Sequence, residues 1–132
     1  MAHDREEYAL EEGVPPISHY TDAVRFGNLL FISGLAPLDN DLKLVSSDVV
    51  EQTRAIFEQM QALLDKAGGS FADVLRVTVY LTDVNDRTKI NPVRQEYFGE
   101  ALPASTLIGV NELAIPGMKV EIEAIVGLPR EP

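Results

Sequence analysis

The sequence contains no cysteine and only two histidines. Without cysteine the chain has no disulfide framework, no thiolate zinc site and no cysteine nucleophile. A catalytic zinc site needs several imidazoles, but His3 lies at the start of the chain and leaves His19 alone in the rest of it. We therefore expect no metal site.

Positively charged residues and long apolar runs are also scarce. The chain has 11 Lys and Arg, scattered singly, against 21 Asp and Glu, which gives a formal net charge of -10. Such a charge repels phosphate backbones, so we expect no nucleic-acid partner. No run of about 18 apolar residues is present, and the acidic N-terminal stretch lacks the basic and apolar regions of a signal peptide. We therefore predict a cytoplasmic protein without a membrane partner.

What the chain does have is the ordinary composition of a globular protein. Hydrophobic residues make up 45% of its 132 residues and charged residues 24%, which is enough to bury one core. We predict that residues 1–15, which are rich in acidic side chains, form a flexible segment. Residues 16–132 are then expected to form a single domain.

The first local pattern predicts a β-hairpin. Residues 23–37 contain apolar runs on both sides of Gly27–Asn28, a pair that tolerates the positive φ of a hairpin turn. Ser33–Gly34 is expected to break the second strand at its end.

The second pattern predicts an amphipathic helix. In residues 47–69 the apolar side chains recur at spacings of three, four and seven. Asp48 and Glu51 resemble a capping box at its start, and Gly68–Gly69 are expected to stop it.

The second half of the chain predicts a strand, a helix and two further strands. Residues 85–100 have helical composition, but Pro92 lies among them and lacks a backbone donor. This helix is either kinked at Pro92 or begins there, and in the second case Asn91 would be its cap. The expected strands are residues 76–84, 104–110 and 119–127, which complete the order β-β-α-β-α-β-β.

Two helices can cover only one face of such a sheet, so the pattern favours an α+β fold. In the last strand the even-numbered residues from Val120 to Val126 share one face, and Glu121 and Glu123 lie on the other, away from the helices. Apolar side chains occur on both parities of the other strands, which makes the second face of the sheet too apolar to be exposed to water. We therefore predict that subunits pack sheet against sheet. The apolar strand residues concerned are Leu30, Ile32, Val77, Val79, Leu107 and Val110.

Four stretches resemble the Rid family, also called the YjgF/YER057c/UK114 family, in their order and spacing. They are SHYTDAVRFGNLLFISG, QTRAIFEQMQALLDKAGGSFADVLRVTVYLTDVND, LPAS and VEIEAIV. The resemblance implies a chorismate-mutase-like, YjgF-type fold with a mixed sheet and two helices on one face. It also implies a homotrimer whose sites lie in clefts between neighbouring subunits, and hydrolysis of enamines or imines such as 2-aminoacrylate without a cofactor.

The same resemblance implies the site residues. Glu121 is the expected catalytic residue, because an imine carbon needs a positioned water and a nearby proton acceptor. The expected substrate-binding residues are Tyr20, Ser33, Gly34, Asn91, Ser105 and Leu107. His19, Thr106 and Glu123 are secondary candidates, since each is near the implied site in sequence.

One residue departs from the family pattern. After Pro103–Ala104 the deaminating members have an arginine that grips the substrate carboxylate, and here that residue is Ser105. A serine carries no charge, so 2-aminoacrylate is not the expected substrate. Ser105 is not part of a G-x-S-x-G elbow either, so we interpret it as a pocket wall or hydrogen-bond donor rather than a nucleophile.

Three interpretations of function stay open. The first is a hydrolase that deaminates a small unsaturated amine or imine and does not depend on the missing arginine. The second is a non-catalytic trimer that binds a small ligand or regulates. The third is an aminomuconate-type deaminase of aromatic catabolism.

Overall fold

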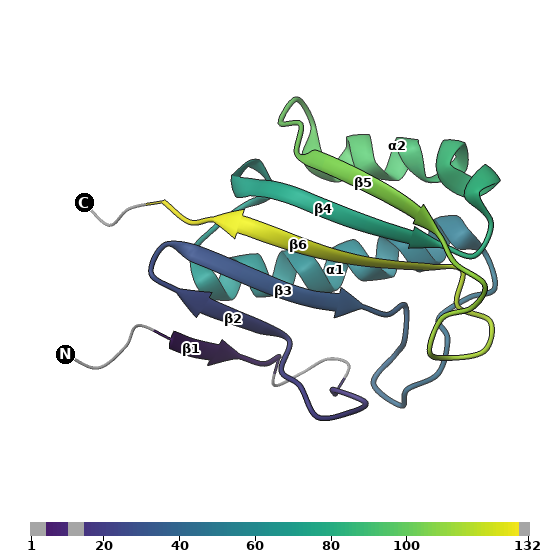
Figure 1. The fold of residues 1–132 in the computed structure, drawn as a ribbon, viewed down its shortest axis with the longest axis horizontal. Helices are drawn as coiled ribbons and strands as arrows, with labels where there is room; N and C mark the ends of the chain where they lie inside the picture. The colour runs from purple at the N-terminus through teal and green to yellow at the C-terminus, as the bar shows by residue number, and fades with distance from the viewer. Residues whose placement is uncertain (1–4, 11–14, 130–132) are drawn as a thin grey trace.

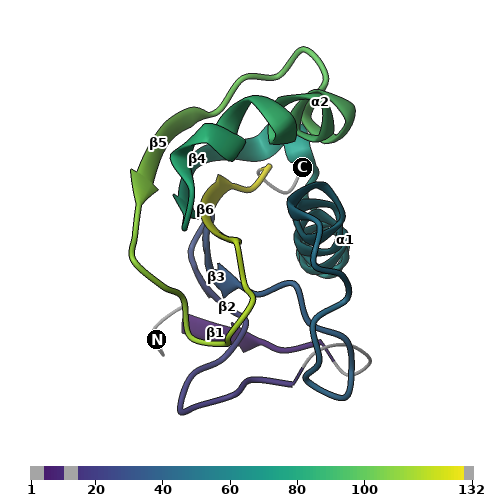
Figure 2. The same ribbon diagram turned by 90° about the vertical axis from the view of Figure 1, so that its right-hand side faces the viewer.

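The computed structural model describes residues 5–10 and 15–129. It contains a six-stranded sheet in the order β1-β2-β3-β6-β4-β5, with α1 (Val49–Ala67) and α2 (Arg87–Phe98) on one face (Figures 1 and 2). The strands are β1 (Arg5–Tyr8), β2 (Ala23–Phe26), β3 (Leu29–Leu35), β4 (Val74–Leu81), β5 (Ala104–Gly109) and β6 (Val120–Gly127). β4 and β5 run parallel and the other neighbouring strands run antiparallel. This is the mixed sheet with two helices on one face that the sequence predicted.

Strand β1 was not predicted. It lies within the segment expected to be flexible and pairs with β2. The Thr21 hydroxyl donates to the Tyr8 carbonyl at 3.0 Å, and the Leu10 N–H donates to the Asp22 carboxylate at 2.9 Å. Residues 1–4 and 11–14 of that segment lie outside the described residues. The domain boundary at residue 15 therefore stays a prediction.

The hairpin of β2 and β3 is confirmed, but its second strand runs further than expected. Gly27 has a φ of 60°, as the turn requires. Strand β3 continues through Ser33–Gly34 to Leu35, and its pairing with β6 shifts register between Ile32 and Leu35. Ser33–Gly34 thus forms an irregular stretch inside the strand. Such irregularities bend a strand locally and are common next to active sites.

Helix α1 is confirmed, with a simpler cap than the sequence suggested. The Asp48 carboxylate accepts from the Val50 N–H at 3.2 Å, but the Asp48 N–H donates to the Ser46 hydroxyl rather than to Glu51. Gly68 ends the helix with a φ of 80°. The predicted apolar stripe is buried against the sheet, and its members include Ile56, Phe57, Met60, Leu63 and Leu64.

Helix α2 begins before Pro92, so the late start that made Asn91 its cap is wrong. Arg87 is its first residue, and Pro92 lies inside it. Asp86 precedes the helix but makes no side-chain cap bond. The Asp83 carboxylate instead accepts from the Asn85 N–H at 3.0 Å, and caps the short 3-10 turn Val84–Asp86 that leads into α2. Asn91 is therefore free of a capping role and exposed on the helix.

The two faces of the sheet differ as predicted along β6, where buried residues alternate with half-buried ones that include Glu121 and Glu123. Four of the six residues used to argue for a covered open face do not lie on that face, however. Leu30, Ile32, Val77 and Val79 all lie in the core beneath the helices, since they share one parity of their strands. The open face carries other apolar side chains, exposed by 40–56%: Phe26, Leu29, Phe31, Leu75 and Ile108. A physical reason to cover this face therefore remains.

Candidate active site

The carboxylate of Glu121 lies over the backbone of β3, where Gly34 leaves room for it. A methyl group added at Gly34 would lie 2.9 Å from Glu121 Cδ and nearer still to Oε2, which is closer than side chains pack. The irregular stretch of β3 thus presents a backbone without a side chain to the second residue of β6. Glycine at this position is what allows the carboxylate its place.

The environment of Glu121 makes its carboxylate a stronger base. Burial raises the pKa of Glu121, and the negative charge of Glu123 on the same face raises it further. The Tyr80 hydroxyl donates to Glu123 Oε1 at 3.3 Å, so the second carboxylate is held by the neighbouring strand. A half-buried carboxylate with a raised pKa suits general-base chemistry.

Glu121 lines a pocket of about 400 Å³, here called the Glu121 pocket. Its lining includes Tyr20, Ser33, Gly34 and Glu121, so the structure brings four of the predicted site residues together. The other lining residues are Ile17, Ser18, Ala36, Ala114 and Met118. The Ser33 hydroxyl donates to the Thr21 carbonyl at 2.6 Å, and the Tyr20 hydroxyl accepts from the Ile17 N–H at 3.4 Å.

Two further predicted residues lie in a second pocket of about 410 Å³, here called the Asn91 pocket, between α2 and the start of β5. It contains Asn91 and Ser105, and its other lining residues are Arg94, Gln95, Phe98, Gly99, Leu102 and Pro103. Arg94 was missed by the sequence analysis. Its Nη2 donates to Ser105 Oγ at 3.0 Å. Its position one helical turn after Asn91 would have placed both on one face of the predicted helix.

The two pockets do not meet within one chain. Glu121 pairs with Tyr80, which pairs with Ile108, so the Glu121 carboxylate and Ile108 share the open face of the sheet. Ser105 pairs with the buried Val77, so its side chain lies on the helix-facing side and further along β5. The predicted site residues of one chain therefore form two half-sites.

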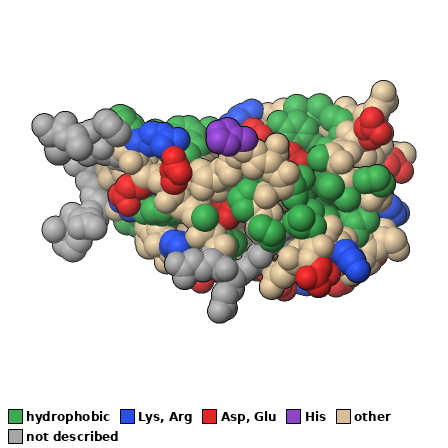
Figure 3. Space-filling model, turned by 90° about the horizontal axis from the view of Figure 1, so that it is seen from below, with side chains coloured by type: hydrophobic (Ala, Val, Ile, Leu, Met, Phe, Trp, Pro, Cys, Tyr) green, Lys and Arg blue, Asp and Glu red, His purple; other side chains and the backbone are tan. Residues whose placement is uncertain are grey.

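The remaining candidates lie apart from both pockets. Leu107 is half-buried and packs against the core. Thr106 and Glu123 lie on the open face, where Thr106 accepts a hydrogen bond from the Arg76 guanidinium and Glu123 accepts the one from Tyr80. His19 is exposed, and a histidine stands open at the surface in Figure 3.

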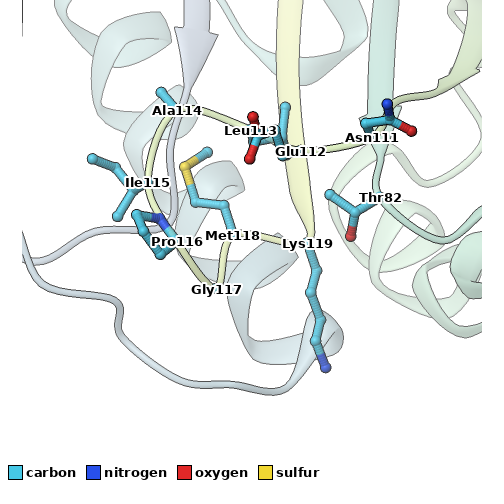
Figure 4. Close-up of a pocket in the computed structure, with 10 residues that line it drawn as sticks. All are labelled: Thr82, Asn111, Glu112, Leu113, Ala114, Ile115, Pro116, Gly117, Met118 and Lys119. Carbon is cyan, nitrogen blue, oxygen red and sulfur yellow. The ribbon is translucent and has the colours of Figure 1, made fainter.

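A larger hollow, of about 580 Å³, is formed by Thr82 and the loop from Asn111 to Lys119 (Figure 4). It contains none of the predicted site residues, and the Lys119 side chain points away from the loop. Ala114 and Met118 also line the Glu121 pocket, so the two hollows adjoin. The Glu121 pocket is the stronger candidate site of the two, because there a half-buried carboxylate with a raised pKa faces the space.

Within residues 5–10 and 15–129, no group of three or more His, Asp or Glu side chains could hold a metal ion. No helix in the same residues has the length and hydrophobicity needed to cross a bilayer.

Comparisons with known proteins agree with the fold. A family model described as "Endoribonuclease L-PSP" matches residues 11–128. A RutC family protein of Pyrococcus horikoshii is 44% identical over 121 residues, which cover 90% of this chain and 95% of that protein. The 3-aminoacrylate deaminase RutC of Acinetobacter baylyi is 36% identical over 121 residues, with the same coverage of 90% and 95%.

Among solved structures, RidA from an Antarctic Psychrobacter superimposes with a TM-score of 0.87 at 31% identity and covers 93% of this chain and 99% of its own. The expected YjgF-type fold is thereby confirmed. Because the similarity runs over most of the chain in sequence and in structure, the chain belongs to the Rid (YjgF) family, whose model bears the description endoribonuclease L-PSP.

Proposed function

We propose that this chain is a cytoplasmic hydrolase that deaminates a small enamine or imine, in a site completed by a neighbouring subunit of a homotrimer. The observation that carries the proposal is the half-buried Glu121 carboxylate, whose pKa is raised by burial and which faces a pocket with the space left by Gly34. The similarity to a 3-aminoacrylate deaminase supports the same class of chemistry.

The proposed reaction begins with water attacking the carbon of a C=N bond whose nitrogen is protonated, while Glu121 accepts a proton from that water. The resulting carbinolamine carries both a hydroxyl and an amine on one carbon. Glu121 then returns its proton to the nitrogen, the C–N bond breaks, and the hydroxyl loses its proton to solvent, which releases ammonia and leaves a carbonyl group. An enamine enters the same route after it takes up a proton on carbon and becomes an imine. Each step moves only protons and water, so it needs no metal or organic cofactor.

The trimer is part of the proposal because the half-sites of one chain lie on opposite faces of its sheet. A neighbouring copy that packs on the apolar open face would bury Phe26, Leu29 and Phe31, which are exposed by 40–56% in the single chain. Such a neighbour can bring its Asn91 pocket to the Glu121 pocket. The reacting molecule would then lie between Glu121 of one subunit and Asn91 with Ser105 of the next.

The substrate preference follows from Ser105. Its hydroxyl cannot form the charge-assisted pair with an α-carboxylate that an arginine would form at the same position. We therefore propose a small unsaturated amine or imine other than 2-aminoacrylate. An aminomuconate-type deaminase is one form that this chemistry could take.

The proposal is tested by ammonia release from a panel of enamines and imines generated in situ, together with native mass spectrometry of the protein. Wild-type protein should accelerate release from at least one member, and Glu121→Gln should lower that rate by about 10²- to 10⁴-fold at unchanged trimer mass. Glu112→Gln is the matched control, because it removes an exposed carboxylate from the adjoining loop and should leave the rate unchanged.

The second candidate is a trimer that binds a small ligand without consuming it. It is favoured by the uncharged Ser105, since a binding site does not need the clamp that orients a reacting carboxylate. Saturable binding of panel compounds without ammonia release from any of them would establish this candidate and overturn the hydrolase.

A further inference from the structure

The guanidinium of Arg94 has an unusual environment for a charged group on the surface of a helix. The side chain is half-buried between α2 and β5, and its Nη2 donates to the neutral Ser105 hydroxyl at 3.0 Å. Burial lowers the pKa of Arg94, because no carboxylate among the described residues lies beside it to offset the loss of water. By contrast, Arg5, Arg54 and Lys89 each form an ion pair with a carboxylate.

Partial burial of a cation costs free energy because the charge loses water, and a bound anion offsets that cost. The guanidinium has about five N–H donors in a planar fork, and Ser105 takes one of them. The chain as a whole carries a net charge of -10, so an anion needs a local cation such as Arg94 to bind it. The site therefore has donors to spare for an anion.

The other groups of the Asn91 pocket suit a small organic anion. Asn91 and Ser105 offer an amide and a hydroxyl, while Phe98, Leu102 and Pro103 supply apolar walls. Arg94 lies in the second half of α2, where the helix dipole is unfavourable to negative charge. One guanidinium in that position matches the single charge of a carboxylate better than the higher charge of a phosphate.

We propose that Arg94, together with Asn91 and Ser105, forms a carboxylate-binding subsite, so that the substrate of the proposed reaction carries a carboxylate. The identity of the reacting group rests on the proposed function. The binding of a carboxylate rests on the geometry of the Asn91 pocket. Arg94 reaches the pocket from α2, whereas a side chain at position 105 would reach it from β5. A carboxylate held by Arg94 is therefore placed differently from one held by an arginine at position 105.

Binding can be tested without turnover by titrating crotonate and its neutral counterpart crotonamide, with amide and arginine NMR signals as the readout. Crotonate is a stable isostere of 3-aminoacrylate. Arg94→Gln should weaken crotonate binding by about 10- to 100-fold, the loss expected for one charge-assisted pair, and leave crotonamide binding unchanged. Arg94→Lys should lose less, because it keeps the charge but not the planar fork.

Arg87→Gln is the matched control. It removes the same charge from the same helix, but Arg87 is exposed, lies outside the pocket and contacts only the Val84 carbonyl, at 3.1 Å, among the described residues. Its crotonate affinity should stay within about twofold of wild type. An equal loss in both variants would mean that net charge rather than the subsite holds the anion, and would overturn the inference.

The outcomes separate this inference from the proposed function. Arg94-dependent crotonate binding in a protein that releases no ammonia from any substrate would support the subsite and overturn the hydrolase. Ammonia release with kcat, KM and crotonate affinity all unchanged in Arg94→Gln would support the hydrolase and overturn the subsite. Failure of crotonate to bind the wild-type protein would also overturn the subsite.

Discussion

Adding one methyl group at Gly34 should move the Glu121 carboxylate and reduce turnover. The methyl carbon would stand 2.9 Å from Glu121 Cδ, and ordinary packing begins at 3.4 Å, so the carboxyl carbon must move by at least 0.5 Å. The nearer oxygen overlaps more and must move by about 1 Å, a displacement that typically costs about 100-fold in rate. Gly34→Ala is therefore expected to lower kcat by about 100-fold, or about 2.7 kcal/mol of transition-state stabilisation.

The same substitution should have little effect on folding. Gly34 is not among the glycines with positive φ, so alanine can adopt its backbone conformation. The overlap is with the far end of a flexible side chain, which can turn aside. The free energy of unfolding, measured in urea at fixed protein concentration, should stay within about 1 kcal/mol of wild type.

A double-mutant cycle tests whether the loss acts through Glu121. If the methyl group acts by displacing the carboxylate, Gly34→Ala should cost nothing further in a Glu121→Gln background, as ammonia-release kinetics can measure. Losses that add independently would refute this reasoning. So would a Gly34→Ala variant with turnover within about threefold of wild type, because the required displacement is too large for that.

Three further predictions concern pH, specificity and assembly. Because the pKa of Glu121 is raised above 4.5, the folded chain holds the Glu121 proton more tightly than the unfolded chain does. This contribution to the free energy of unfolding is complete below pH 4.5 and is lost as the pH rises through the raised pKa. Urea unfolding should therefore show the wild type losing stability relative to Glu121→Gln as the pH rises through that window. In the double variant Ser105→Arg/Arg94→Gln the new guanidinium stands on β5, and Arg94, whose Nη2 lies 3.0 Å from Ser105 Oγ in the wild type, is removed so that the two cations do not repel each other. This variant should release ammonia from 2-aminoacrylate at least about tenfold faster than the wild type. No gain would contradict the role given to position 105. Phe31→Lys places a charge on the open face, where Phe31 is 44% exposed. Native mass spectrometry should then show loss of the trimer, while the circular dichroism of the chain changes little. An intact trimer would show that this face is not the interface.

Local patterns in the sequence determined the elements whose residues lie close together in the chain. The spacing of apolar residues in α1, the Gly27–Asn28 turn and the alternation along β6 each depend on the fixed geometry of a helix, turn or strand. The same alternation placed Glu121 on the face away from the helices. The resemblance to the Rid family supplied the candidate residues, and four of them line one pocket.

Only the tertiary structure decided what depends on pairing between distant segments. Strand β1 forms because β2 offers it an edge, and α2 continues through Pro92 because tertiary packing of Ile90 and Val93 outweighs one lost backbone bond. The opposite faces of Glu121 and Ser105 follow from the registers of β6, β4 and β5, which no local period encodes. The contact between Arg94 and Ser105 likewise joins a helix to a strand across a pocket, so it became visible only when the two were packed together.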